Sequence, residues 1–249
     1  IKISKIIILK MKDKQNKNTI LFFTIAILLV LLDQITKLTI KGFSFAGFEI
    51  QGLRYGESIP ILGNLLQLTF VENEGMAFGI SFGWGKIFLS IFSLIASGFL
   101  AYYLYLLCKF SKNNLLKFSI ALILAGAFGN AIDRNFYGII FNESPLFYGR
   151  VVDFILVNIP DINLFGITYS HFPVFNIADA CVTCGVILLV IMHKKLPEIN
   201  ELLSNNKKNI KNKENLENNL ENNIENNLKK KLKNNLKNNL EKKENLDNF

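Results

Sequence analysis

The chain has 249 residues, of which 50% are hydrophobic, and its mean hydropathy is +0.29. This composition is too apolar for an ordinary soluble domain and favours a membrane protein. The net charge of +8 is concentrated in lysine-rich segments that flank apolar runs, so it follows the positive-inside rule and no nucleic-acid partner is expected.

Four apolar runs predict four membrane-spanning helices within a domain of residues 20–195. Residues 1–19 form a basic leader before the first span, which extends to about residue 40. The other three spans are expected at residues 84–107, 115–132 and 173–192. Residues 196–249 form a low-complexity tail rich in Asn and Lys, which we expect to be disordered or loosely helical.

Two long segments separate these spans and contain no lysine. Residues 42–82 carry strand-like pieces, and residues 135–172 are expected to form a second long loop. Because both ends of the chain and the loop at 109–117 are basic, both termini are expected in the cytoplasm and both long segments outside. The sequence therefore predicts an all-α membrane protein with four transmembrane helices and a small periplasmic β-like platform.

Two aspartates, Asp153 and Asp179, lie among apolar residues near the predicted outer boundary. An aspartate inside a membrane is unfavourable by about 2.5–3.5 kcal/mol, so two of them suggest a function. One hypothesis is a carboxylate pair that shares a proton, in which one member activates water and the other protonates a peptide carbonyl. The alternative is that each acid is a helix cap or an ion-pair partner.

Helical spacing places further polar side chains next to these acids. Asp33 and Lys37 are four residues apart in the first span and are expected to pair. Asn176 lies three residues before Asp179, where it can orient that carboxylate or bind substrate backbone.

The end of the third span carries Asn130, Asp133 and Arg134, whose spacing places them on one helix face. Asp133 and Arg134 can form a plain ion pair, and Arg134 can also meet a lipid phosphate. Asn73, in a glycine-containing stretch, is either a turn residue or a ligand of substrate backbone, and spacing does not decide between them.

Other chemistries have less support in the sequence. The chain has two histidines and lacks both the HExxH zinc motif and the Gly-x-Ser-x-Gly elbow. A proton-coupled transporter would distribute its acids across the depth of the membrane, and a structural membrane subunit would use them only as caps. The clustering of the acids at one boundary favours the carboxylate-pair hypothesis.

Five motifs in the chain resemble those of signal peptidase II, the lipoprotein signal peptidase family of bacterial membrane aspartyl proteases. The resemblance covers residues 20–193, and the motifs occur in the order of the family. They are Asp33-Gln34-x-x-Lys37, Asn73-x-Gly75-x-Ala77-Phe78-Gly79, Gly129-Asn130-x-x-Asp133-Arg134, Val151-Val152-Asp153-Phe154 and Phe175-Asn176-x-Ala178-Asp179.

The resemblance implies that Asp153 and Asp179 are catalytic and that no metal or cofactor is used. Asp33, Lys37 and Asp133 would then be structural. The positions that the family uses around the site correspond to Asn73, Gly126, Asn130, Arg134, Asn176 and Ala178.

The implied substrate is a diacylated prolipoprotein in the membrane, cut just before its lipidated cysteine. The implied inhibitors are globomycin-type cyclic peptides, and the implied location is the bacterial cytoplasmic membrane with the site near its outer face. This chain departs from the family in having Ala125 where a glycine is usual, and in a longer stretch at residues 160–173.

Overall fold

The computed structural model describes residues 2–45, 47–75, 83–164 and 167–192, together with residues 203–208, 211, 212, 215, 219 and 229 of the tail. The chain divides into two compact units, residues 1–196 and 197–249. Residues 203–208 of the tail are helical. Most of the tail, which was expected to be disordered or loosely helical, lies outside the described residues. The same is true of the motif residues Ala77, Phe78 and Gly79.

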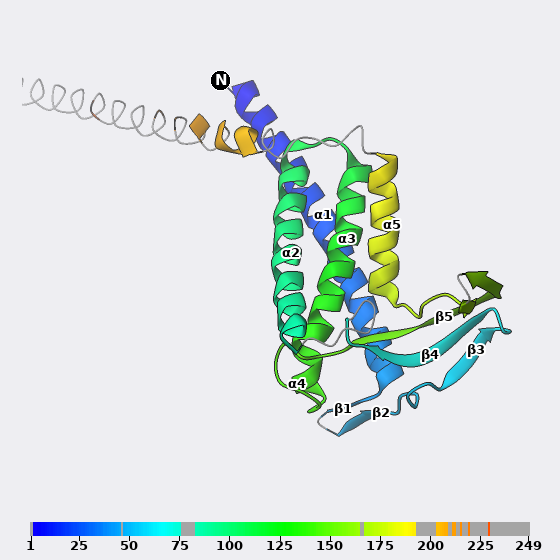
Figure 1. Cartoon of the computed structure of the whole chain (residues 1–249). Coiled ribbons are helices and arrows are strands. Elements are labelled where there is room, and N and C mark those ends of the chain that lie inside the picture. The colour runs from blue at the N-terminus through cyan, green and yellow to red at the C-terminus, as the bar shows by residue number, and fades with distance from the viewer. Residues whose placement is uncertain are drawn as a thin grey trace, which may run out of the picture. The chain divides into compact units, whose positions relative to one another are not determined.

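Four helices form a bundle in which the third is the central member, because it packs extensively against each of the others (Figure 1). They are α1 (Lys2–Lys41), α2 (Gly83–Phe110), α3 (Asn114–Ile132) and α5 (Ile177–Ile191). The predicted basic leader is not a separate element, since α1 continues from it into the first span without a break. Helix α3 begins where the side chain of Asn113 accepts a hydrogen bond from the backbone of Leu116.

Three of these helices are long and apolar enough to cross a membrane, within residues 16–41, 85–110 and 114–140. Helix α5 is apolar but has only 15 residues, which corresponds to about 22 Å of helix. A bilayer core is about 30 Å thick, so the described part of α5 is short for a complete span. The described chain therefore has three long apolar helices and a shorter one, where four full spans were predicted.

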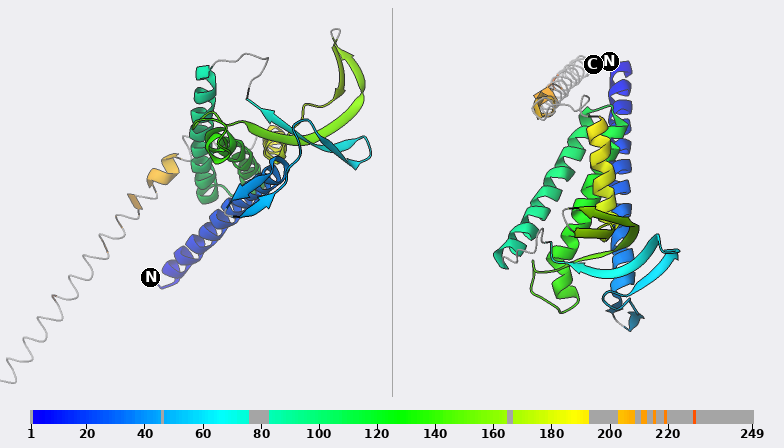
Figure 2. Two further views of the ribbon diagram at one scale, coloured as in Figure 1. Left: turned by 90° about the horizontal axis from the view of Figure 1, so that it is seen from below. Right: turned by 45° about the vertical axis from the view of Figure 1, so that its right-hand side comes forward.

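A sheet at one end of the bundle replaces the predicted outer loop. It is antiparallel with the strand order β3–β4–β5–β6, and a separate hairpin of β1 and β2 precedes it. The strands are β1 (Phe43–Phe45), β2 (Phe48–Ile50), β3 (Ser58–Leu62), β4 (Leu66–Asn73), β5 (Val151–Leu164) and β6 (Ile167–His171). The predicted β-like platform is present as this sheet, but the prediction of a long loop at 135–172 was wrong, because that segment supplies β5 and β6 and β5 pairs with β4. Figure 2 shows this sheet curving away to one side of the bundle.

An apolar cluster holds the platform against the bundle. Its fully buried members come from the end of α1, from β4 and β5, and from the π-helical turn η1 (Asp133–Tyr137) that continues α3 into the short helix α4 (Gly138–Ile140). They are Ile40, Phe70, Tyr137, Val152 and Phe154. Burial of each such side chain contributes about 1.5–3 kcal/mol, so the cluster fixes β5 firmly beside α3.

Candidate active site

Asp153 lies on β5 between two core residues, and its own side chain is 3% exposed. Its Oδ2 accepts a hydrogen bond of 3.0 Å from Nδ2 of Asn73, which ends the neighbouring strand β4. Its Oδ1 accepts a hydrogen bond of 2.7 Å from Nδ2 of Asn176. Both carboxylate oxygens are therefore oriented by amide groups from two different elements.

Asp179 lies in the first turn of α5, where it forms a capping box with Asn176. The Asn176 Oδ1 accepts from the backbone N–H of Asp179 at 2.9 Å, and Oδ2 of Asp179 accepts from the backbone N–H of Asn176 at 3.2 Å. The other oxygen, Oδ1, accepts a hydrogen bond of 2.8 Å from Nδ2 of Asn130. The capping role left open by the sequence is thus present and leaves Asp179 at the same site as Asp153.

Two asparagines connect the carboxylates. Asn176 donates both to Asp153 and to Oδ1 of Asn130, the latter over 3.1 Å, and Asn130 donates in turn to Asp179. The structure therefore brings together Asp153, Asp179, Asn73, Asn130 and Asn176, which come from β5, α5, β4, α3 and the N-terminal cap of α5.

A buried ion network supports this arrangement from the side of α1. The Nζ of Lys37 lies 2.8 Å from Oδ2 of Asp33, 2.8 Å from Oδ2 of Asp133 and 2.9 Å from Oδ1 of Asn130. The predicted pairing of Asp33 with Lys37 is confirmed. Asp133 also accepts a hydrogen bond of 3.3 Å from the backbone N–H of Val152, next to Asp153. Asp133 forms its ion pair with Lys37, whereas the sequence had suggested a plain ion pair between Asp133 and Arg134.

Glycines permit the close approach of α3 and α5 behind the site. A Cβ on Gly126 would lie 2.2 Å from the carbonyl oxygen of Ala178, and one on Gly129 would lie 2.8 Å from Oδ2 of Asp33. The same Asp33 accepts a hydrogen bond of 2.9 Å from the backbone N–H of Ala178 through its Oδ1. Ala178 is 1% exposed, so it is a packing position next to Asp179.

Arg134 supplies a positive group beside the carboxylates. Its charge interacts favourably with Asp133, Asp179 and Asp153. Its Nε is buried and has no hydrogen-bond partner among the residues that the structure describes, and it lies 3.6 Å from the position that a Cβ on Gly75 would occupy. A buried donor without a partner is unusual in a folded protein, and a ligand can satisfy it.

Burial raises the pKa of Asp153 to about 6, from an ordinary value of 3.8. The hydrogen bond from Asn73 opposes this effect, whereas the negative charge of Asp179 adds to it. Asp153 therefore holds a proton at higher pH than an exposed aspartate. Among the described residues, the acids, histidines and cysteines form no cluster suited to a metal ion.

Sequence reasoning gave Gln34 no role, although the residue is part of the network. Its Nε2 donates to Oδ1 of Asp133 at 2.9 Å and to the carbonyl oxygen of Gly129 at 3.1 Å. Its Oε1 accepts a hydrogen bond of 3.1 Å from the hydroxyl group of Tyr137. The available signal was a polar amide directly after Asp33 in an otherwise apolar span.

Apolar helices that carry buried acids, linked by amides beside an antiparallel sheet, are the arrangement expected of a membrane-embedded aspartic peptidase. The comparisons with known proteins agree. The sequence model of the family described as Signal peptidase (SPase) II matches residues 25–194. The chain therefore belongs to the signal peptidase II family.

Relatives match over most of their own length. A lipoprotein signal peptidase of Pelodictyon phaeoclathratiforme is 38% identical over 178 residues, which cover 71% of this chain and 91% of the relative. One of Porphyromonas gingivalis is 34% identical over 209 residues, covering 74% and 86%. A solved bacterial membrane enzyme is 33% identical, with a TM-score of 0.49 and coverage of 69% and 90%.

Proposed function

We propose that Asp153 and Asp179 are the catalytic pair of this peptidase and that it hydrolyses diacylated prolipoproteins just before their lipidated cysteine. The observation that carries the proposal is the hydrogen-bonded connection of the two carboxylates through Asn176 and Asn130. Family membership supplies the reaction class, and the hydrogen-bonded geometry supports this choice of residues.

Asp153 is suited to the role of acid. It is almost fully buried and its pKa is raised to about 6, so near neutral pH a larger fraction of it carries a proton for the substrate carbonyl oxygen than of an ordinary aspartate. Asp179 is suited to the role of base, because its side chain is only partly buried, so water can reach it, and two N–H groups that donate to its oxygens hold it in place. Asp179 takes a proton from water, and the water oxygen attacks the peptide carbonyl carbon. The tetrahedral intermediate then breaks at the C–N bond as Asp179 passes its proton to the leaving nitrogen, and Asp153 takes back the proton that it gave to the carbonyl oxygen.

Arg134 and Asn73 are the proposed substrate ligands. The free Nε of Arg134 can donate to a peptide carbonyl, which satisfies a buried donor that has no partner in the described structure. Asn73 lies at the end of β4 and reaches Asp153, so a peptide held along this strand end is placed against the acid. Globomycin-type peptides are expected to occupy the same position and compete with the substrate.

The proposed membrane placement follows from the lengths of the helices. Both termini are placed in the cytoplasm by the positive-inside rule, and the platform then lies outside. Helix α5 is short and carries Asp179 in its first turn, which supports a position of this acid near the outer boundary of the membrane. The acyl chains of the substrate can then stay in the lipid while water reaches the site from outside.

The test uses the purified full chain in detergent with a diacylated prolipoprotein, and cleavage is followed by a mass shift on a gel. Asp153→Asn and Asp179→Asn are each expected to lower kcat by about 10³-fold, since each removes a proton-transfer group. The matched control is Asp161→Asn, on an exposed position of the same strand β5. Normal cleavage by either dyad variant, or no cleavage by the wild type, would overturn the proposal.

A further inference from the structure

The end of β4 presents different chemistry on its two faces. Asn73 donates to Asp153, whereas its neighbours Glu72 and Glu74 form ion pairs with basic side chains. Successive side chains of an extended segment point to opposite faces. The ion pairs of Glu72 and Glu74 therefore lie on one side of this short segment, and the contact of Asn73 with Asp153 lies on the other. Ion pairs that hold the glutamates in place also restrict the movement of Asn73.

Glu74 joins three elements of the structure. Its Oε2 lies 2.9 Å from Nζ of Lys86, in the first turn of α2, and its Oε1 lies 3.1 Å from Nε of Arg150, directly before β5. The hydrogen bond from Lys86 lowers the pKa of Glu74, so the carboxylate is ionised at neutral pH. Each oxygen of Glu74 thus has its own cation, from a different side.

The turn that follows Asn73 leaves little room for compensating movement. The backbone N–H of Gly75 donates to Oδ1 of Asn73 at 2.8 Å, and Gly75 has a φ of +77°. A Cβ at this position would lie 2.7 Å from Cδ2 of Leu89 on α2. Because Glu74 lies between these two hydrogen-bonded residues, a displacement of Glu74 is expected to move the Asn73 side chain.

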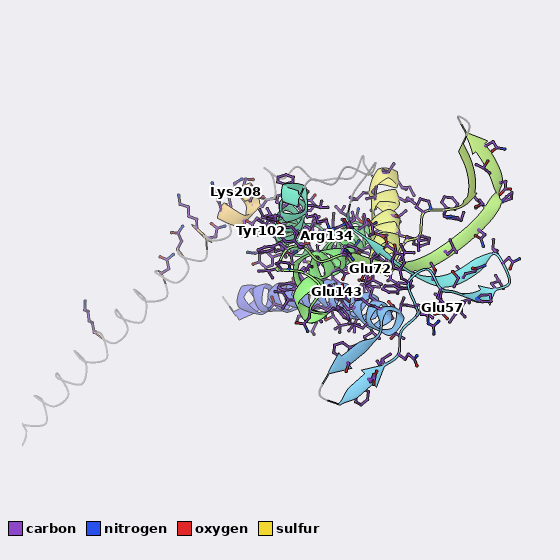
Figure 3. All side chains as sticks on the ribbon, turned by 60° about the horizontal axis from the view of Figure 1, so that its bottom comes forward. Glu57, Glu72, Tyr102, Arg134, Glu143 and Lys208 are labelled. Carbon is purple, nitrogen blue, oxygen red and sulfur yellow. The ribbon has the colours of Figure 1, made fainter. Side chains whose placement is uncertain are left out.

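The other charges of this surface belong to the same network. Arg150 also lies 3.1 Å from Oε2 of Glu72, and Glu72 pairs with Lys41 at the end of α1. Lys41 contacts Glu143 at 2.7 Å on the far side, and Figure 3 shows Glu72 and Glu143 close together there. Glu143 is therefore connected to the Asn73 segment only through Lys41 and Glu72. Glu74, in contrast, is directly adjacent to Asn73 in the chain.

We propose that Glu74 is a positioning residue of the peptidase: by bridging Lys86 and Arg150, it holds the Asn73 amide against Asp153. The proposal rests on the assignment of Asp153 to the catalytic pair. The side chains of Glu74 and Lys86 are 37% and 20% exposed, so their pairing adds little to global stability and is weakened by salt. Loss of this pairing is therefore expected to lower kcat and to change the stability of the protein little.

The decisive experiment is a double-mutant cycle on the full chain, with kcat and KM measured for a diacylated prolipoprotein at low ionic strength. Glu74→Gln removes both ion pairs and nearly preserves shape, and we expect kcat to fall about tenfold through misplacement of Asn73. The same change in an Asn73→Ala background should have no further effect, because the group through which Glu74 acts is gone. Lys86→Gln breaks one pair from the other side and should reproduce part of the loss.

Glu143→Gln is the matched control and should leave kcat unchanged, since it removes an ion pair that does not involve Glu74. Added salt should lower kcat of the wild type toward that of Glu74→Gln and change the variant little. Full activity of Glu74→Gln, or an equal tenfold loss in the Asn73→Ala background, would overturn the positioning role and leave the catalytic pair intact. Full activity of Asp153→Asn would instead overturn the catalytic pair itself.

Discussion

Asn176 donates a hydrogen bond of 2.7 Å from Nδ2 to Oδ1 of Asp153, while its own Oδ1 caps helix α5. One side chain therefore begins the helix that carries Asp179 and also orients Asp153 on the platform. A helix cap fixes where the helix begins and how it is rotated about its axis. The two contacts of Asn176 therefore set the position of Asp179 relative to Asp153. The relation depends on the amide having both a donor and an acceptor.

Replacement of Asn176 by Ser should separate the two roles. Serine is a good N-cap residue, so α5 should stay capped and the thermal unfolding midpoint should fall less than in Asn176→Ala, where about 1 kcal/mol of capping is also lost. Both variants lack the Nδ2 donor, and kcat should fall about 100-fold in each. The measurements are thermal unfolding in detergent and cleavage of a lipidated substrate. Equal stability of the Ser and Ala variants would contradict the capping argument.

Lys37 compensates the buried charges of Asp33 and Asp133, and all three side chains are at most 1% exposed. Lys37→Met should lower the free energy of unfolding by about 3–5 kcal/mol, since it leaves buried carboxylates without a cation. The double variant Lys37→Met/Asp133→Asn should be more stable than the single variant, because one uncompensated charge is removed. Thermal or denaturant unfolding in detergent tests this order, and the reverse order would show that the network does not act through charge.

The helical part of this fold was predictable because its signals are local. Length and hydropathy predict the long spans, and the i, i+4 spacing of Asp33 and Lys37 predicts their contact. The spacing of Asn176 and Asp179 likewise predicts that they lie close together, although the structure makes Asn176 the N-cap of α5 and not a residue within the helix. These features depend on residues within one helical turn of each other.

The setting of Asp153 was not predictable, because it depends on pairing between distant segments. The apolar residues around it were interpreted as lying in lipid, but Val152 and Phe154 are buried in a strand that pairs with β4. A short apolar run does not distinguish a buried strand from a membrane segment by periodicity. The bridging of Glu74 to Lys86 and Arg150 was missed for the same reason.

The raised pKa of Asp153 predicts how activity changes with pH. Asn73 donates a hydrogen bond that stabilises the ionised form, so its removal in Asn73→Ala should raise the pKa of Asp153 above its value of about 6. If Asp153 is the acid, kcat/KM declines as the pH rises through this pKa, and the alkaline limb should move to higher pH in the variant. The apparent value belongs to the carboxylate pair and is read from pH profiles of both enzymes. A shift to lower pH would contradict this assignment.

The contact of α3 with α5 predicts opposite effects for two Gly→Ala substitutions. A Cβ on Gly126 would lie 2.2 Å from the carbonyl oxygen of Ala178 and 2.6 Å from Cγ2 of Val182, so the helices must separate and Asp179 must move with α5. Gly98, in α2, has nothing within 4 Å of the corresponding position, and alanine is the better helix former by about 1 kcal/mol. Gly126→Ala should therefore lower both the unfolding midpoint and kcat, by about 100-fold for kcat if Asp179 moves by about 1 Å. Gly98→Ala should match or exceed the stability of the wild type and cleave normally. Similar losses in both variants would show that the close approach at Gly126 does not determine the position of Asp179.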